Sequence, residues 1–343
     1  MNIFQKYLAE EFVEDYQEGR ISRRQALKLI ASVTGSIVLA SSLLAACAPV
    51  DPARTSPAPA GAGETPAQPS ATFEPASSPT ETPTAESEPG ATATQDSPPA
   101  GLTEGPVNAT VSPDDPAVQA SAIQFAGEDT ELMGYLAHPA AEGSFPVVLV
   151  CHENRGLTDH IRDVTRRLAK AGYVALAVDL LSRQGGTSAV GSDQVPGALV
   201  NMSPDQYVQD FRSGWLYLQD QAFAQSERLG MVGFCFGGGV TWLMATRMPE
   251  LKAAVPYYGP HPSLADVPNI QAAVLAIYGE LDQRINQGIP DIEAAMQEHN
   301  KIFEKMIYPN ADHAFNNDTS SRYNPEAAQA AWQRTLEWFE TYL

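Results

Sequence analysis

Cys235 lies at the centre of a glycine-rich segment, residues 233–239, that joins a predicted strand to a predicted helix. A sharp turn of this kind lifts its central side chain above the sheet, and flanking glycines avoid clashes with neighbouring backbone. A thiol at a helix N-terminus is made more acidic by the free N–H groups and the helix dipole. The N–H of Phe236, directly after the cysteine, would point at a developing oxyanion. We therefore interpret Cys235 as a nucleophile.

Two other interpretations of this segment remain. A phosphate-binding loop would need Gly-x-Gly-x-x-Gly spacing or a following Lys-Ser/Thr pair, and the segment has neither. A structural cysteine would be a small buried side chain beside closely packed glycines.

An acid and a histidine follow the cysteine in the chain. Asp282 comes just after one predicted strand, and His313 comes just after the next. Because parallel strands end at the same edge of a sheet, both side chains should lie near Cys235. His313 would accept the thiol proton and later protonate the leaving group, while Asp282 would orient the imidazole and stabilise its cation. Glu280 and Asp312 are alternative acids, but Asp282 lies beyond the strand end and is preferred.

Alternating strands and helices position these residues. The pattern predicts an α/β fold with a mostly parallel central sheet flanked by helices, and with its active loops at the carboxyl ends of the strands. A polar, glycine-containing loop is predicted over 182–202. The predicted strands are 119–125, 131–137, 146–151, 173–178, 228–234, 252–257, 272–278 and 301–308, and the predicted helices are 158–171, one from 203, 236–247 and 325–343. Thr158 and Ser203 are the expected N-caps of the first two helices, with Pro204 in the first turn of the second.

Composition divides the 343 residues unevenly. Of 27 prolines, 15 fall within 48–116, a stretch with a single aromatic residue. Such a stretch cannot bury enough apolar surface to fold, so a disordered Pro/Ala/Ser/Thr-rich linker is predicted, followed by one domain over 117–343. Of the net charge of −20, the domain carries −11, which excludes nucleic-acid binding. If Cys47 is lipidated, only Cys151 and Cys235 remain, so no disulfide framework is expected. Cys151 is expected in the core. The remaining histidines show no metal-ligand spacing, and neither a metal nor a cofactor is expected.

The N-terminal residues 1–47 have the pattern of an export signal. Arg23 and Arg24 precede an uncharged run, 29–46, which ends in Leu-Ala-Ala before Cys47. The arginine pair resembles a twin-arginine signal, and the ending resembles a bacterial lipoprotein box in which Cys47 becomes lipidated. An uncleaved transmembrane anchor is the alternative. Either arrangement places the domain outside the cytoplasm, at the outer face of the cytoplasmic membrane or the cell surface, with the linker as a tether.

With Cys235, Asp282 and His313 in this order, residues 120–343 resemble the dienelactone hydrolase (carboxymethylenebutenolidase) family of α/β-hydrolases, and in particular an exported branch of it. The resemblance rests on the cysteine turn, on Gly-Glu-Leu-Asp at 279–282 and on His-Ala-Phe at 313–315. It implies a Cys-His-Asp triad, an acyl-cysteine intermediate and hydrolysis of a small ester, lactone or thioester. We expect a monomer. Isomerase or transferase chemistry on the same acyl-enzyme, or a non-catalytic tethered binding lipoprotein, are the alternatives.

The resemblance also extends to the segment after residue 151. The N–H of Asn154 would be the second oxyanion donor, and Glu153 matches a family glutamate thought to interact with the resting cysteine. A carboxylate near a thiol raises the pKa of that thiol. The family's dienelactone-processing members hold the substrate carboxylate with two arginines, and one of these positions is Asn317 here. This departure should change specificity more than chemistry. The candidate cationic contacts are Arg155, Arg183 and Arg322.

Overall fold

The computed structural model describes residues 1–46 and 110–343. Both stretches belong to one compact unit. The predicted linker over 48–116 and the lipidation candidate Cys47 therefore fall largely outside the described residues. The packed chain begins upstream of the predicted boundary at 117, because Val111 is buried and its N–H donates to Asp163 Oδ1 at 2.8 Å.

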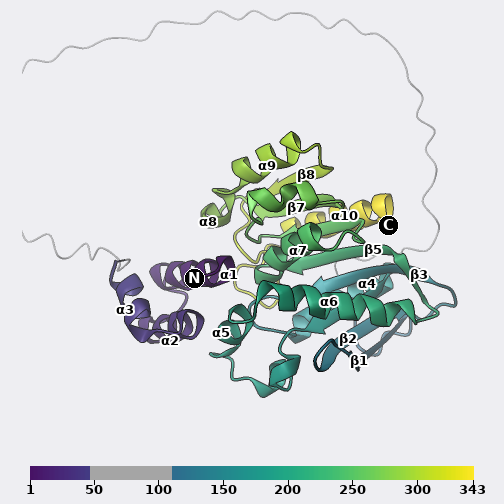
Figure 1. The fold of residues 1–343 in the computed structure, drawn as a ribbon, viewed down its shortest axis with the longest axis horizontal. Coiled ribbons are helices and arrows are strands. Elements are labelled where there is room, and N and C mark those ends of the chain that lie inside the picture. Colours follow the sequence, from purple (N-terminus) through teal and green to yellow (C-terminus); the bar gives the residue numbers. More distant parts are fainter. Residues whose placement is uncertain (47–109) are drawn as a thin grey trace, which may run out of the picture. The chain divides into compact units, whose positions relative to one another are not determined.

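The core of the fold is one eight-stranded sheet with the order β1-β2-β4-β3-β5-β6-β7-β8 (Figure 1). β2 pairs antiparallel with β1 and β4, and the other neighbours pair parallel. The strands are β1 (Val118–Ala126), β2 (Glu131–Pro139), β3 (Phe145–Cys151), β4 (Val174–Asp179), β5 (Ala224–Phe234), β6 (Ala253–Tyr257), β7 (Ala273–Gly279) and β8 (Phe303–Tyr308). The predicted α/β fold with a mostly parallel sheet is confirmed.

Helices cover both faces of this sheet. α6 and α7 lie in front of it in Figure 1, and α4 and α10 lie behind it. Burial from both sides explains why every residue of β4, β6 and β7 is buried and why these strands are apolar except for Asp179, the last residue of β4. The helices predicted from the sequence are α4 (Asp159–Lys170), α6 (Pro204–Gln219), α7 (Phe236–Arg247) and α10 (Pro325–Tyr342).

Local signals at the helix starts were only partly right. Ser203 caps α6 as predicted, accepting the N–H of Gln206 at 3.2 Å, and Pro204 occupies the first turn. Thr158 stands at the start of α4, but its side chain makes no capping hydrogen bond. The loop predicted over 182–202 instead contains two short 3₁₀ turns and a helix. The helices that the sequence pattern missed are α5 (Val195–Val200), α8 (Gln283–Asn286) and α9 (Ile289–Glu298).

The N-terminal segment folds into three helices, α1 (Ile3–Gln17), α2 (Arg23–Thr34) and α3 (Ile37–Ala46). The uncharged run over 29–46 is divided between α2 and α3 at Gly35, whose φ of 69° ends α2. Among the helices described, none has the length and apolar character needed to cross a membrane. α1 contacts α5 and α7, and α2 packs on α5. The N-terminal helices therefore share the core of the sheet domain.

Candidate active site

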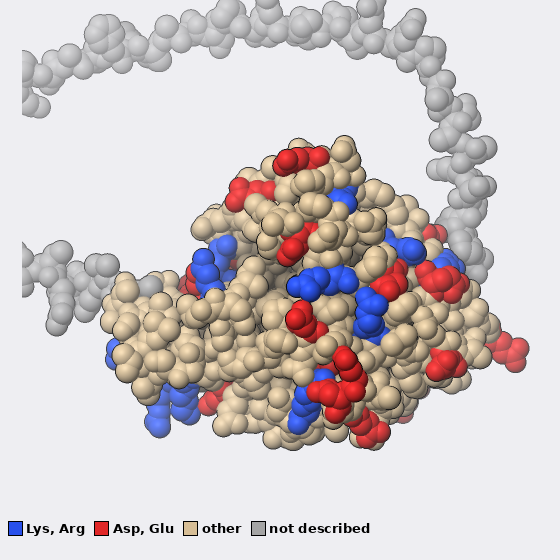
Figure 2. Space-filling view, in the orientation of Figure 1, with Lys and Arg blue, Asp and Glu red and all other residues tan. Residues whose placement is uncertain are grey.

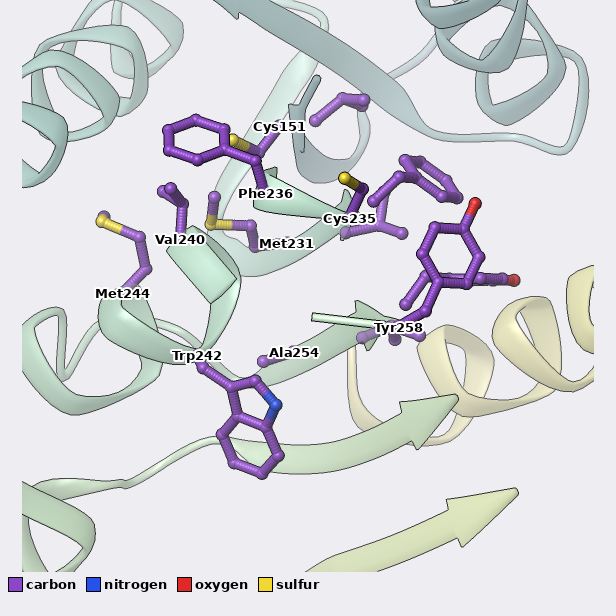
Figure 3. Packing of buried hydrophobic residues seen from close by; sticks show 14 of the residues in the cluster. Cys151, Met231, Cys235, Phe236, Val240, Trp242, Met244, Ala254 and Tyr258 are labelled. Carbon is purple, nitrogen blue, oxygen red and sulfur yellow. The ribbon is translucent and has the colours of Figure 1, made fainter. Parts of the chain in front are cut away.

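Cys235 occupies the turn between β5 and α7. Its backbone has φ 58° and ψ −119°, a strained conformation for a residue other than glycine. A Cβ on Gly233 would lie 2.2 Å from the carbonyl oxygen of Gly237, so only glycine fits there. Figure 3 shows Cys235 and Phe236 among buried apolar side chains, with Cys151 on the neighbouring strand. This is the sharp strand-to-helix turn predicted from the sequence.

His313 and Asp282 come from the loops that follow β8 and β7. Asp282 Oδ2 lies 2.6 Å from His313 Nδ1, and the two side chains are 1% and 2% exposed. Asp282 Oδ1 also accepts the N–H of Ile285 at 3.2 Å, which holds the carboxylate in place. The structure thus selects Asp282 as the partner of His313 among the three acids considered.

The two alternative acids have other partners. Glu280 Oε2 accepts the backbone N–H of Asn310 at 2.9 Å. Asp312 Oδ1 accepts the backbone N–H of His313 itself at 2.7 Å. Neither contact involves the imidazole ring.

The cation of His313 is strongly stabilised. Burial by itself would lower its pKa, but the charge and hydrogen bond of Asp282, together with the Cys235 thiol, raise the pKa of His313 to about 10. Burial by itself would raise the pKa of Asp282, yet the positive His313 holds the pKa of this carboxyl below its usual value. Asp282 therefore stabilises the imidazolium that His313 becomes when it accepts a proton.

Two side chains from α1 enter the site, and the sequence analysis assigned a role to neither. The Tyr7 hydroxyl donates to Cys235 Sγ at 3.2 Å and lies 3.3 Å from His313 Nε2. Glu11 Oε2 accepts from Cys235 Sγ at 3.6 Å, and Glu11 Oε1 accepts from Asn154 Nδ2 at 2.9 Å. Cys235 is consequently only 3% exposed.

These surroundings disfavour the thiolate. Burial is the largest cause that raises the pKa of Cys235, and the Glu11 carboxylate is the next. Burial alone would raise the pKa of Glu11 as well, but the positive charges of His313 and Arg284 hold it below its usual value. Glu11 is therefore charged while it lies against a neutral thiol.

Glu153 lies near the thiol but is held by Asn317. The Asn317 amide donates to Glu153 Oε2 at 2.6 Å, while Glu153 Oε1 is buried with no hydrogen-bond partner among the described residues. Glu153 is 7% exposed, so it is not a solvated loop charge. Its charge also raises the pKa of Cys235, as predicted, but less than that of Glu11. The side-chain amide of Asn317, the residue compared above with a family arginine, is therefore hydrogen-bonded to the Glu153 carboxylate.

The three arginines considered as substrate contacts have different surroundings in the structure. Arg183 donates to Asp210 Oδ2 at 2.8 Å and pairs with Asp129, which gives it a structural role rather than the substrate contact proposed from the sequence. Arg155 is exposed. Arg322 does face the site region, but across α1, with Nη1 3.6 Å from Asp15 Oδ1.

One group of side chains in the described part of the chain has the composition of a metal site. The ligand atoms of Glu11, Cys235 and His313 lie within 4.8 Å of one another, and all three residues are buried. Thiolate, imidazole and carboxylate are the ligands that Zn²⁺ uses, and Asp282 would support the imidazole from its other nitrogen. The sequence could not indicate this group because one member comes from α1.

The spacing of apolar residues in α1 is the one feature of the sequence that could have drawn attention to Tyr7 and Glu11. Phe4, Leu8 and Phe12 recur at helical spacing and are all buried, with Tyr7 and Glu11 on the adjoining face. That pattern indicates a helix that packs against another part of the protein, but it does not identify that part.

The sheet order, the strained turn and the loops that carry His313 and Asp282 define an α/β-hydrolase fold.

Comparison with known proteins gives the family. Residues 132–343 match the model of the dienelactone hydrolase family. A Methylorubrum extorquens protein described as a carboxymethylenebutenolidase is 35% identical over 246 residues, covering 68% of this chain and 84% of its own. A Bradyrhizobium protein described as a 2-oxo-3-(5-oxofuran-2-ylidene)propanoate lactonase is 32% identical over 223 residues, covering 62% of this chain and 90% of its own.

A solved structure agrees with these relatives. The structure described as a dienelactone hydrolase from Klebsiella pneumoniae superposes with a TM-score of 0.62 at 32% identity, covering 66% of this chain and all of its own. The chain belongs to the dienelactone hydrolase family, and it is an enzyme that hydrolyses ester or lactone bonds.

Proposed function

We propose that this enzyme cleaves small esters and lactones through an acyl-Cys235 intermediate. The observation that carries the proposal is the strained position of Cys235 at the start of α7, with a ring nitrogen of His313 within 4.8 Å of its sulfur. On the other side of the imidazole, Asp282 Oδ2 lies 2.6 Å from Nδ1. A carboxylate, an imidazole and a thiol in this order are the components of nucleophilic acyl transfer.

The reaction has two halves. The Cys235 thiolate, whose proton has passed to His313, forms a bond to the substrate carbonyl carbon, and the carbonyl electrons move to oxygen. The N–H groups of Phe236 and Asn154 are the proposed donors to that oxyanion. The intermediate collapses, the C–O bond of the ester breaks, and His313 protonates the departing alkoxide. Water then gives its proton to His313 and attacks the thioester, which releases the acid and restores the thiol.

Substrate choice is expected to differ from that of dienelactone-processing relatives. Asn317 stands at an arginine position and is hydrogen-bonded to Glu153, so it offers no cation to a substrate carboxylate. Neutral lactones and simple esters are therefore the proposed substrate class.

A direct test measures hydrolysis of p-nitrophenyl acetate and small lactones by the full-length chain carrying Phe4→Ala, which removes a buried side chain of α1 and so loosens the helix that covers Cys235. Intact-mass spectrometry should detect an acetyl group on Cys235 early in the reaction, and Cys235→Ala should abolish both the adduct and turnover. An enzyme that turns over equally well with alanine at 235 would exclude this mechanism.

We also propose that residues 1–47 direct export, with a lipid on Cys47. Arg23 and Arg24 are exposed at the start of α2, where an export receptor can reach them, and Figure 2 shows basic side chains at the surface beside this helix. Cell fractionation tests this: Cys47→Ser should shift the protein from the membrane to the soluble fraction, and an unchanged distribution would contradict lipidation.

A further inference from the structure

The side chains of α1 occupy the space that a substrate needs. A carbonyl carbon must come within about 3–3.5 Å of the nucleophile before it reacts. The Tyr7 hydroxyl already lies 3.2 Å from Cys235 Sγ, and Glu11 Oε2 lies 3.6 Å from it. No acyl group can take its place over the sulfur while both side chains are there.

Glu11 also opposes the chemistry. Glu11 raises the pKa of the Cys235 thiol, after the larger effect of burial, and so disfavours the nucleophilic thiolate. Its Oε2 lies 3.9 Å from His313 Nε2, the nitrogen that has to accept the thiol proton. An anion at that distance favours the imidazolium, which cannot act as a base. The position of Glu11 between the sulfur and the imidazole thus adds an unfavourable charge to a site that the two side chains already fill.

Complementary charge and apolar contact hold α1 in this position. Arg284 Nε donates to Glu14 Oε2 at 3.1 Å, and its guanidinium lies 4.6 Å from the centre of the Tyr7 ring. At the other end of the helix face, Phe4 packs edge-on against Phe236 and Tyr207, each with ring centres 5.4 Å apart. These contacts form a specific docking surface for the helix.

The fit is nevertheless incomplete. Arg284 Nη1 is buried with no hydrogen-bond partner among the described residues, and Arg284 Nη2 and Arg322 Nη1 reach their carboxylates, Glu11 and Asp15, only at ion-pair distances of 3.8 and 3.6 Å. Buried donors that lack acceptors destabilise the state in which they occur, and water or a ligand can satisfy them once the helix leaves. The docked state is therefore suited to displacement.

We propose that α1 is an autoinhibitory plug that keeps the active site closed until the N-terminal segment leaves. The proposal rests on the proposed acyl-cysteine function. If Cys47 is the processing site, cleavage before it removes residues 1–46, α1 among them, so the enzyme would become active only after export. An esterase that is silent during synthesis would spare thioesters and esters inside the cell.

The test uses the full-length chain carrying Cys47→Ser, so that Cys235 is the reactive thiol. Cys151 is fully buried and does not compete. The rate of iodoacetamide modification is followed by intact mass, and p-nitrophenyl acetate hydrolysis is followed in parallel. Phe4→Ala removes the aromatic anchor of α1, and both rates should rise at least about tenfold. Lys6→Ala, whose side chain is 68% exposed on the same helix, is the matched control and should leave both rates unchanged.

Tyr7→Phe distinguishes a plug from a catalytic tyrosine. The phenyl ring keeps the shape of the helix face but removes the hydroxyl that contacts sulfur and imidazole. A plug predicts that hydrolysis does not fall, whereas a proton-transfer role for Tyr7 predicts a clear loss of turnover, which would overturn the proposal.

The remaining outcomes are also decisive. Unchanged modification of folded Phe4→Ala would show that α1 does not restrict access, and the plug would be refuted. Faster modification without ester hydrolysis in any variant would support the plug and refute the proposed hydrolytic mechanism. If melting curves show that Phe4→Ala is unfolded, Glu14→Ala, which removes the 3.1 Å hydrogen bond that Arg284 donates to α1, takes its place under the same criteria.

Discussion

Replacing Asp282 by asparagine tests the proposed triad most directly. Asn can keep the acceptor that binds the Ile285 N–H, because that hydrogen bond uses Oδ1. The other oxygen, 2.6 Å from His313 Nδ1, becomes an NH₂ group. The amide then donates to Nδ1, which moves the imidazole proton to Nε2 and leaves no base facing Cys235. Size and packing are preserved, so the change is electrostatic.

The size of the effect follows from the buried ion pair. Burial works against the His313 cation, yet Asp282 and the thiol together raise the pKa of His313 from 6.5 to about 10. This net shift corresponds to roughly 5 kcal/mol, shared between Asp282 and the thiol after the opposing effect of burial. Loss of the acid in comparable triads costs about 10⁴-fold. We therefore expect kcat/KM to fall by about 10³- to 10⁴-fold, equivalent to roughly 4–5 kcal/mol.

The assay is p-nitrophenyl acetate hydrolysis by the full-length enzyme, repeated in the Phe4→Ala background, where the site should be open. Glu280→Gln is the control, because Glu280 is exposed and bonded to the Asn310 backbone. Its kcat/KM should stay within about twofold of wild type. A decrease of less than about tenfold for Asp282→Asn, or an equal decrease for the control, would refute the assignment of Asp282 as the orienting acid.

Other predictions concern the thiol and the turn that carries it. Glu11→Gln should move the midpoint of the pH dependence of Cys235 alkylation to lower pH, because a negative charge that raises the thiol pKa is removed. Glu153→Gln should move the midpoint in the same direction by less. A larger shift for Glu153→Gln would contradict the stronger effect assigned to Glu11. Gly238→Ala should destabilise the protein by about 1–3 kcal/mol, since its Cβ would lie 2.3 Å from the carbonyl oxygen of Tyr257. Thermal unfolding should show a Tm lower by ~2–4 °C per kcal/mol, whereas Gly191→Ala, with its nearest atom at 3.8 Å, should unfold like wild type.

Much of the scaffold could be predicted from local sequence. The eight strands and the helices α4, α6, α7 and α10 were expected near their observed positions, because strands covered on both faces require continuous apolar runs. The short helices α5, α8 and α9 were missed, since they lie in loops whose conformation depends on what they pack against. Thr158 was wrongly expected to cap α4 with its side chain, because residue type alone does not set the side-chain rotamer.

The sequence by itself determined the strained turn at Cys235 and brought His313 and an acid to the same edge of the sheet. Each of these residues directly follows a strand, so local order was enough to place them. Only the tertiary structure decided which acid meets the imidazole, since Glu280, Asp282 and Asp312 follow the same strands and differ in the direction of their side chains. It alone brought Glu11, 224 residues away in the chain, against the sulfur of Cys235. The docking of one helix on a distant surface depends on shape and charge contributed by many separate segments, and no local pattern records that combination.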